Sequence, residues 1–180
     1  GDATKAIENL TKALKVFEEM GIKPGVAAIS ANLGKRYFER GDYKLALKYC
    51  NTSLEIFEEG RNKGGIANTT SLMGSIYAAQ GHYTKAISYG ERGLAIAQET
   101  GVLSSIESSA QNLFSSYKTA GKYKEALEMN ELYFQARDSI QSKENQKAVI
   151  QSQVQSEYEK QKAIDDLENE KRVAIETQKK

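Results

Sequence analysis

The sequence of 180 residues has one cysteine, one histidine and one proline, and it has no tryptophan. A single cysteine excludes an intrachain disulfide and a zinc site built from cysteines. A single histidine, His82, excludes histidine-rich metal sites and most catalytic triads. Uninterrupted apolar runs reach only three or four residues, so we expect no direct membrane insertion. No signal-peptide pattern opens the chain. Because it starts at Gly1 rather than Met and stops within a charged stretch, we expect a fragment of a longer protein.

The charges nearly cancel, with 25 Lys and Arg against 24 Asp and Glu and a net charge of +1. A nucleic-acid-binding protein would carry a basic excess, so we expect no nucleic acid partner. Hydrophobic residues make up 39% of the sequence, which is low for a compact globule. This composition predicts a thin molecule with little deep interior.

Several residue types recur every 40 positions along the chain. Four columns repeat in phase, namely Gly41, Gly81 and Gly121; Tyr43, Tyr83 and Tyr123; Ala46, Ala86 and Ala126; and Tyr37, Tyr77 and Tyr117. A further column contains Leu14, Leu54, Leu94 and Phe134. So many columns in one phase indicate a repeat protein.

Within each period, apolar residues recur at steps of three and four, which is typical of amphipathic helices. Gly41, Gly81 and Gly121 lie between two such stretches, where one helix ends and the chain reverses. Pro24 stands where the first turn of a helix should begin. We therefore predict helices at residues 3–20, 24–40, 43–60, 63–80, 83–100, 103–120 and 123–141. One pair of helices cannot bury its apolar stripe alone, so neighbouring pairs must stack.

The motifs Leu33-Gly34-x-x-Tyr37 and Gly41-x-Tyr43-x-x-Ala46 resemble the tetratricopeptide repeat in its 40-residue variety. The copy with Met73-Gly74-x-x-Tyr77, Gly81-x-Tyr83 and Ala86 fits equally. The resemblance implies an all-α fold, a right-handed superhelix of helix hairpins followed by a long C-terminal helix. It divides the chain into a repeat array at 1–141 and a charged C-terminal helix at 142–180. The array would consist of a half repeat at 1–20 and repeats at about 24–60, 63–100 and 103–141.

Small residues in the repeated columns, such as Gly34 and Gly74, would let the two helices of a pair cross closely. We expect the rings of Tyr37, Tyr77 and Tyr117 to fill the space between adjacent pairs. The third repeat has Phe114 where the earlier ones have glycine, and the preceding helix contains Gly90 and Gly93. Our hypothesis is that the Phe114 ring fills the volume beside these two glycines.

The stretch from 143 to 180 contains eight basic and eight acidic residues, and 11 of its 38 positions are apolar. It contains no Gly or Pro, so it favours a long solvated helix that would run about 56 residues if continuous with 123–141. A heptad pattern places Ile150, Glu157, Ile164 and Lys171 on one seam, with Val154, Gln161, Glu168 and Ile175 on the other. With four of eight positions apolar, residues 143–180 could form a weak homodimeric coiled coil or a single helix that frays into disorder.

No group of side chains converges as an active site requires, so we predict no catalytic residue, no metal site and no cofactor. His82 lies between two helices and is interpreted as a surface turn residue. Cys50 lies on the inward column of its helix, and we expect a small buried thiol. The neighbouring carboxylates Glu18-Glu19 and Glu58-Glu59 project about 100° apart, so they are not acid/base pairs. We therefore predict that the fragment is not an enzyme.

The first helix of each pair should line the concave face of the array. Around the inward Leu33, Met73 and Leu113, the exposed inner positions carry mostly amides, hydroxyls and small side chains. The predicted peptide-binding residues are Asn32, Lys35, Asn68, Ser71, Ser75, Ser108, Gln111, Asn112 and Ser115. Such donors and acceptors suit the backbone of an extended peptide. The segments with Asn32 and Asn112 also resemble the asparagine-bearing first helices of peptide-binding members of the family, whereas the lysine-rich carboxylate clamp of the family is not matched.

Three functional interpretations stay open from the sequence. The first is a scaffold that binds a protein or peptide on its concave face. The second is a sensory or regulatory segment of a larger membrane-bound bacterial signalling protein, a histidine kinase or nucleotide cyclase, with catalysis outside the fragment. That layout would place the segment in the cytoplasm or periplasm. The third, a catalytic fragment, is disfavoured because no constellation of reactive groups is found. The alternative to a peptide-binding groove is a concave surface with no binding function, because fold alone does not give function.

Overall fold

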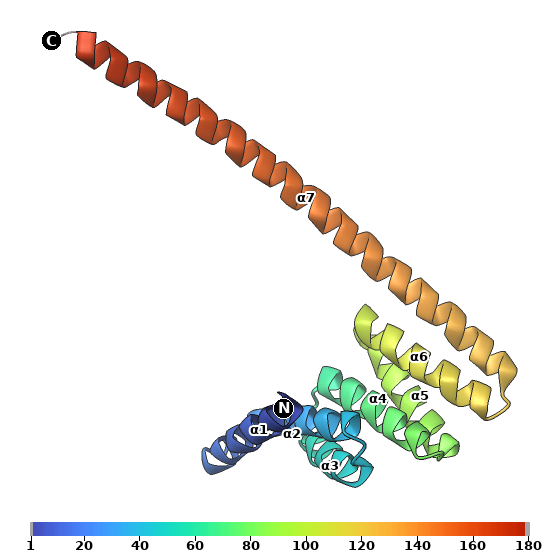
Figure 1. The fold of residues 1–180 in the computed structure, drawn as a ribbon. Coiled ribbons are helices and arrows are strands. Elements are labelled where there is room, and N and C mark those ends of the chain that lie inside the picture. Colours follow the sequence, from blue (N-terminus) through green and yellow to red (C-terminus); the bar gives the residue numbers. More distant parts are fainter. Residues whose placement is uncertain (1, 179–180) are drawn as a thin grey trace. The chain divides into compact units, whose positions relative to one another are not determined.

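The computed structural model describes the backbone of residues 2–178 and the side chains of residues 4–162. Seven helices and no strand occur in residues 2–178 (Figure 1). They are α1 (Asp2–Glu19), α2 (Lys23–Glu39), α3 (Tyr43–Glu59), α4 (Lys63–Ala79), α5 (Tyr83–Thr100), α6 (Leu103–Thr119) and α7 (Tyr123–Gln178). The predicted all-α fold is confirmed, and the predicted bounds of the first six helices differ from these by one residue at most.

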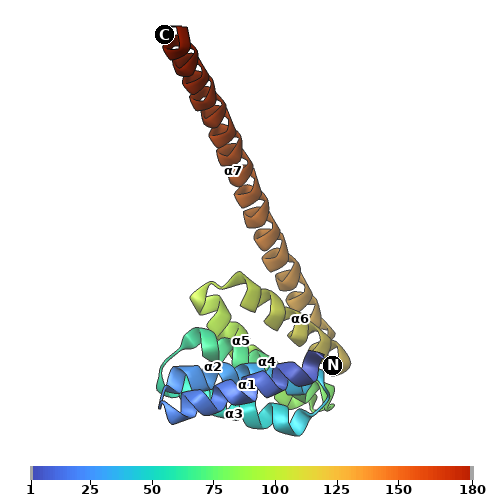
Figure 2. The ribbon, with the colours of Figure 1, turned by 60° about the vertical axis from the view of Figure 1, so that its left-hand side comes forward.

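The predicted helix at 123–141 and the predicted C-terminal helix form one helix, because α7 runs unbroken from Tyr123 to Gln178. Its 56 residues are the length expected for an unbroken helix. No Gly or Pro occurs after Gly121, so the sequence contains no residue that would end the helix earlier. The chain divides into two units, Gly1–Asp138 and Ser139–Lys180. The first unit contains α1 to α6 and the beginning of α7, and consecutive helices from α1 to α6 pack against each other (Figures 1 and 2).

The turns between helices recur every twenty residues, and each contains one residue with a left-handed backbone conformation. Gly21, Gly41, Gly81, Gly101 and Gly121 have φ between 68° and 82°, which glycine adopts without strain. The sixth such position in residues 2–178 is Arg61, with φ of 51°. Here the glycine of the turn, Gly60, comes one residue earlier and has an ordinary φ of −80°. This turn therefore carries a strained arginine in place of an unstrained glycine.

The apolar core lies between helices, and the tyrosine columns belong to it. Tyr37 stacks on Tyr49 with ring centroids 5.5 Å apart, and Tyr77 stacks on Tyr89 at 5.3 Å. Tyr37 and Tyr77 also pack against one cluster that joins α3 to α4. Tyr117 is buried in a second cluster formed by α5, α6 and α7. The expectation that these rings pack between adjacent pairs is confirmed. The ring that stacks on Tyr37, and the ring that stacks on Tyr77, belongs to the second helix of the same helix pair.

The helices of a pair approach closely where the sequence has small residues. A Cβ atom added to Gly34 would lie 2.7 Å from the Cys50 sulfur, and one added to Gly74 would lie 3.1 Å from the Ala86 carbonyl oxygen. Both distances are shorter than ordinary contacts. The predicted close crossing of α2 with α3 and of α4 with α5 is therefore confirmed.

The hypothesis that Phe114 fills the volume beside Gly90 and Gly93 is wrong. A Cβ atom at Gly90 would lie 2.8 Å from Leu113 Cδ2, so the leucine fills that space. A Cβ atom at Gly93 would meet α4 first, 3.0 Å from Thr70 Oγ1. Neighbouring residues of a helix project about 100° apart, so Phe114 cannot face the glycine that Leu113 covers. Its ring packs at the margin of the second cluster instead.

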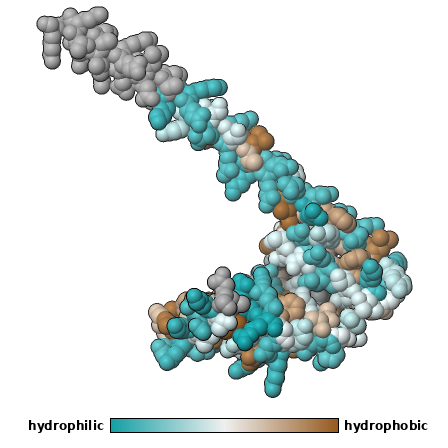
Figure 3. Space-filling model, viewed as in Figure 1, coloured by the Kyte–Doolittle hydropathy of each residue, from teal (hydrophilic) through white to brown (hydrophobic). Residues whose placement is uncertain are grey.

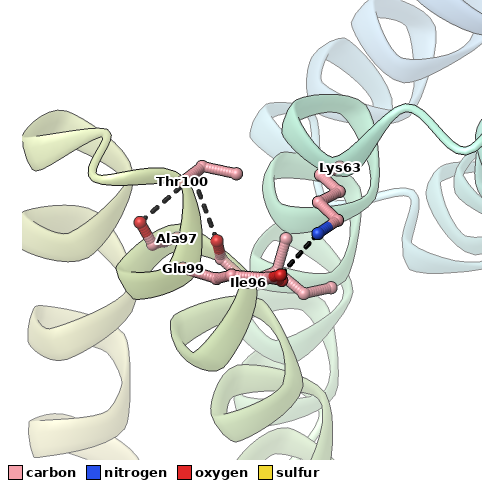
Figure 4. A network of polar contacts seen from close by, with 5 residues as sticks. All are labelled: Lys63, Ile96, Ala97, Glu99 and Thr100. Carbon is pink, nitrogen blue, oxygen red and sulfur yellow. Dashed lines mark hydrogen bonds and ion pairs between the residues drawn. The ribbon is translucent and has the colours of Figure 1, made fainter.

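Glutamates at the ends of α3 and α5 form ion pairs with other helices. Lys23 Nζ at the start of α2 lies 2.7 Å from Glu59 Oε2 at the end of α3. Forty residues later, Lys63 pairs with Glu99 in the same way (Figure 4). The hydrogen bond to Glu59 raises the pKa of Lys23 above its ordinary value. These pairs are exposed, so we expect them to orient the helix ends and to contribute little to stability.

An aromatic ring covers a glycine at the start of two first helices. Phe17 lies over Gly25, and forty residues later Phe57 lies over Gly65, where an added Cβ atom would lie 2.5 Å from the ring. In the third repeat Ala97 replaces the phenylalanine and Ser105 replaces the glycine. The aromatic side chain is therefore lost at the same contact where the glycine gains a side chain. A Cβ atom added to the adjacent Gly64 would lie 3.7 Å from Asn62 Oδ1, which is an ordinary contact distance.

We predict that Arg61→Gly raises the free energy of unfolding by about 0.5–1 kcal/mol, because it removes the left-handed strain of a non-glycine residue. Urea denaturation followed by circular dichroism measures the change. Arg40→Gly is the matched control, since Arg40 ends α2 with a right-handed φ of −86°, where glycine brings no relief and lowers stability. Equal effects of the two substitutions would contradict the explanation.

We predict that Gly65→Ala lowers the free energy of unfolding by about 1–3 kcal/mol, because the methyl group displaces the Phe57 ring. Gly64→Ala is the control, and we expect it to leave stability unchanged or to raise it slightly through helix propensity. Adding Phe57→Ala to Gly65→Ala should cost less than the sum of the single changes, since the clash is then gone. Additive losses in urea denaturation would show that the ring does not cause the effect.

Candidate functional site

A groove of about 490 Å³ runs across the first helices of the three pairs. We call it the concave groove. Its lining residues are Ala31, Asn32 and Lys35 of α2; Asn68, Thr69, Ser71, Leu72 and Ser75 of α4; and Val102, Ser104, Ser105, Ser108 and Asn112 in or just before α6. The second helices α3 and α5 contribute no residue to this lining.

The first helices line one surface because they are neighbours in space. α4 contacts both α2 and α6 directly, although a second helix separates each pair of them in sequence. Leu33, Met73 and Leu113 are buried on the inner side of these helices. Residues next to them in the helical pattern therefore point out of the core and into the groove.

The structure brings together seven of the nine predicted binding residues. Asn32, Lys35, Asn68, Ser71, Ser75, Ser108 and Asn112 all line the concave groove. Gln111 and Ser115 do not line it, although they correspond by the 40-residue step to Ser71 and Ser75. Ser115 instead hydrogen bonds to the Gln111 carbonyl of its own helix, at 3.3 Å. The lining of α6 is shifted toward its N-terminus because each pair is rotated relative to the preceding one.

Sequence reasoning missed Val102, Ser104 and Ser105, which the shift brings into the groove. A signal for two of them was present in the sequence. Ser104 and Ser105 stand where the preceding first helix has Gly64 and Gly65. The replacement of these two glycines by serines could have indicated that the N-terminal turn of α6 belongs to the lining.

Hydrogen bonds connect α4 to α6 across the floor of the groove. Ser105 Oγ donates to Asn68 Oδ1 at 3.0 Å, and Ser109 Oγ donates to Ser71 Oγ at 3.3 Å. The first of these bonds occupies the acceptor of the Asn68 amide and leaves its NH₂ group available. Among the described side chains, the amides of Asn32 and Asn112 have no hydrogen-bonding partner. The groove therefore offers amide donors and acceptors at both of its ends and a donor in the middle.

The groove is nearly uncharged. Among its described lining residues, Lys35 is the only charged one, and it is exposed. No lining residue is acidic. Such a surface accepts a neutral segment along most of its length and favours a negative group only near Lys35.

Reactive groups elsewhere in the described residues do not meet in a site. Cys50 is fully buried, and burial raises the pKa of its thiol to about 12, so it stays protonated near neutral pH. The Tyr117 hydroxyl donates to Glu91, and burial together with this bond raises its pKa. His82 is exposed at the start of α5. No group of His, Cys, Asp or Glu among the described side chains could hold a metal ion.

The face of the molecule drawn in Figure 3 is mostly polar. On the face drawn in Figure 3, hydrophilic residues (teal) predominate and hydrophobic ones (brown) form small patches. Within the described part of the chain, no helix combines the length and the apolar composition that crossing a membrane requires.

Solved structures with a similar fold were found by structural comparison. BtubC (BKLC) from P. vanneervenii is 25% identical with a TM-score of 0.70, covering 78% of this chain and 59% of its own. A putative kinesin light chain from P. anserina with nearly identical TPR-like repeats is 20% identical with a TM-score of 0.59, covering 78% and 70%. A Rap protein complexed with Competence and Sporulation Factor is 20% identical with a TM-score of 0.51, covering 78% and 49%. This chain thus spans 59% of the length of BtubC and 49% of the length of the Rap protein.

A comparison with curated proteins gives no match. The family model described as tetratricopeptide repeat matches residues 1–59 and residues 25–99, which together make up more than half of the chain. The matched residues include α1 to α5, and thus the half repeat and the first two helix pairs. The chain therefore belongs to the tetratricopeptide repeat family.

Proposed function

We propose that the chain is a scaffold module whose concave groove binds an extended segment of another protein. The observation that carries this proposal is the set of unpartnered amides of Asn32 and Asn112 at opposite ends of an uncharged groove. Amide groups pair with both the N–H and the C=O of a peptide main chain, so they hold a segment whatever its side chains are.

The dimensions of the groove suit a short stretch of extended chain. Packed helices lie about 8–10 Å apart, so the path from α2 over α4 to α6 measures roughly 16–20 Å. An extended peptide advances about 3.3 Å per residue, so the groove has room for about five or six residues. Small side chains such as Ala31 and Ser108 leave space above the helices for the main chain of the ligand.

The preformed bond between Ser105 and Asn68 supports the same function. It holds the middle amide in one orientation before any ligand arrives, which lowers the entropy cost of binding. Lys35 at the α2 end would favour a ligand with an acidic side chain there. The Rap structure, a complex with Competence and Sporulation Factor, has the same fold, and this similarity supports binding as a function of the array.

In this proposal the two parts of the chain have different roles. The array at 1–141 carries the binding surface, and the charged helix at 142–180 connects it to a second copy. Residues Ile150 and Val154 on the heptad seam are exposed and available for such contact. The extent of α7, which reaches Gln178, favours a second candidate function as the sensory segment of a larger signalling protein. Ligand binding would then shift the paired helices, and catalysis would lie outside this chain.

We predict that Asn32→Ala with Asn112→Ala weakens peptide binding at least tenfold and lowers the melting temperature by no more than a few degrees. Each lost hydrogen bond to the ligand corresponds to about 1 kcal/mol, and both residues are on the surface. The probes are peptides selected on the wild-type chain from a random display library, and fluorescence anisotropy measures affinity. Gln111→Ala with Ser115→Ala is the control outside the groove. Unchanged affinity of the asparagine variant would reject the site.

We predict that the full chain is a dimer at high concentration and that Ile150→Glu with Val154→Glu makes it a monomer. Both residues lie on the heptad seam, where a buried carboxylate would oppose association. Sedimentation or light scattering gives the mass. Val149→Glu changes an equally exposed neighbour that lies off the seam, and it should leave the dimer intact. A wild-type monomer would exclude dimerisation through this helix.

A further inference from the structure

The last helix of the array exposes the columns that the earlier second helices bury. In the column of Leu14, Leu54 and Leu94, exposure is 7–8%, but Phe134 in the same column is 47% exposed. In the next column Ile7 and Ile87 are 7% and 8% exposed and Leu47 is partly buried, whereas Leu127 is 59% exposed. Tyr123 is likewise exposed at 71%, while Tyr43 and Tyr83 are partly buried. These residues all lie within the first 138 residues, so the contrast belongs to the array itself.

One kind of helix covers these columns wherever they are buried. α2 covers Ile7 and Leu14 of α1, α4 covers Leu54 of α3, and α6 covers Ile87 and Leu94 of α5. The covering residues follow one pattern, an aliphatic residue at position i, Leu or Met at i+7 and Tyr at i+11. The three sets are Val26, Leu33 and Tyr37; Ile66, Met73 and Tyr77; and Ile106, Leu113 and Tyr117.

A polar contact accompanies the last of these interfaces. The hydroxyl of Tyr117 in α6 donates to the Glu91 carboxylate of α5. The residue forty positions after Glu91 is Glu131, which is exposed on α7. Among the described side chains, Glu131 has no hydrogen-bonding or ionic partner. The exposed apolar columns of α7 therefore lie beside Glu131, whose carboxylate could accept a hydrogen bond from the tyrosine of a covering helix.

We propose that Tyr123, Leu127, Glu131 and Phe134 form an end face that binds an α-helix of a partner protein. The partner helix carries an aliphatic residue at i, Leu or Met at i+7 and Tyr at i+11, and its tyrosine hydroxyl donates to Glu131. The argument rests on continuity, since the end face repeats the surface that receives α2, α4 and α6 within this chain. The end face is separate from the concave groove, and neither depends on the other.

A second copy of the chain does not supply the required helix. The patterned residues of all three first helices are already buried in the array, with Leu33, Met73 and Leu113 at most 1% exposed. A symmetric pair of end faces would bring together two copies of the segment 123–138, which carries four acidic and two basic residues, and like charges oppose such pairing. The proposed occupant is accordingly a helix of a partner protein and not one of the first helices of a second copy.

The centre of the end face adds a preference for one side chain. Asn130 stands in the column of Cys50 and Gly90. Leu113 packs against Gly90, whereas Cys50 shares its cluster with Met73. Asparagine is close to cysteine in size and leaves less room than glycine does. Leu10 of the same column packs in the cluster of Leu33, so both leucine and methionine occur at i+7, and the unbranched side chain of methionine adapts more readily to the side chain of Asn130.

The test uses the full chain and a labelled peptide with the sequence of residues 103–119 that carries Leu113→Met. Isolated helices of this length are marginal, so the peptide is stapled at the exposed positions of Gln111 and Ser115. Fluorescence anisotropy should show saturable binding that Leu127→Glu weakens at least tenfold. Val16→Glu, which changes an exposed apolar residue of α1, should leave the affinity unchanged. Circular dichroism checks that each variant is folded.

A second measurement tests the polar contact and separates the end face from the groove. Tyr117→Phe in the peptide should weaken binding to the wild-type chain severalfold but have no further effect on Glu131→Ala. Asn32→Ala with Asn112→Ala should bind the peptide as the wild type does. The proposal is overturned by absent binding, by equal affinity for wild type and Leu127→Glu, or by a dimer that Leu127→Glu alone dissociates.

Discussion

The whole array depends on one interaction, the burial of the apolar face of one helix pair by the first helix of the next. The two helices of a pair pack on each other through small residues, whereas large and fully buried side chains such as Leu33 and Leu113 lie where pairs meet. Leu33, Met73 and Leu113 are at most 1% exposed because each is enclosed by helices of two successive layers. The same columns form every interface, so stability accumulates from similar nearest-neighbour contacts.

This constraint explains why small residues matter as much as large ones. A large side chain can reach across an interface only if the opposite helix gives it space, as Gly90 does for Leu113. Within a pair, Gly34 and Gly74 let the helix axes approach closely. Where one repeat changes a residue, another residue changes with it, as in the replacement of Phe57 and Gly65 by Ala97 and Ser105. The serine that results provides the bond to Asn68 in the groove.

Stacked pairs leave two chemically different surfaces uncovered. The concave side presents amides and hydroxyls because those positions face away from every layer. The end of the stack presents Leu127 and Phe134, which have the chemistry of an interface but no covering layer among the described residues. The first surface suits a peptide main chain, and the second suits a helix with matching side chains.

The sequence alone determined the repeat, the helices and the turns, because these depend on residues close together in the chain. Glycine at a left-handed position and apolar residues at steps of three and four act within one helix or one turn. The bounds of the first six helices followed within a residue, and seven of the nine predicted binding residues lie in the groove because the face of each helix could be read from the pattern. Only the tertiary structure decided that α6 enters the groove through Ser104 and Ser105, that Leu113 covers Gly90, and that the columns of α7 stay exposed. Those outcomes depend on how far each helix pair is rotated relative to the preceding one and on whether a further pair packs on the last helix. A periodic sequence pattern predicts the same surroundings for every repeat, so it could not predict these differences.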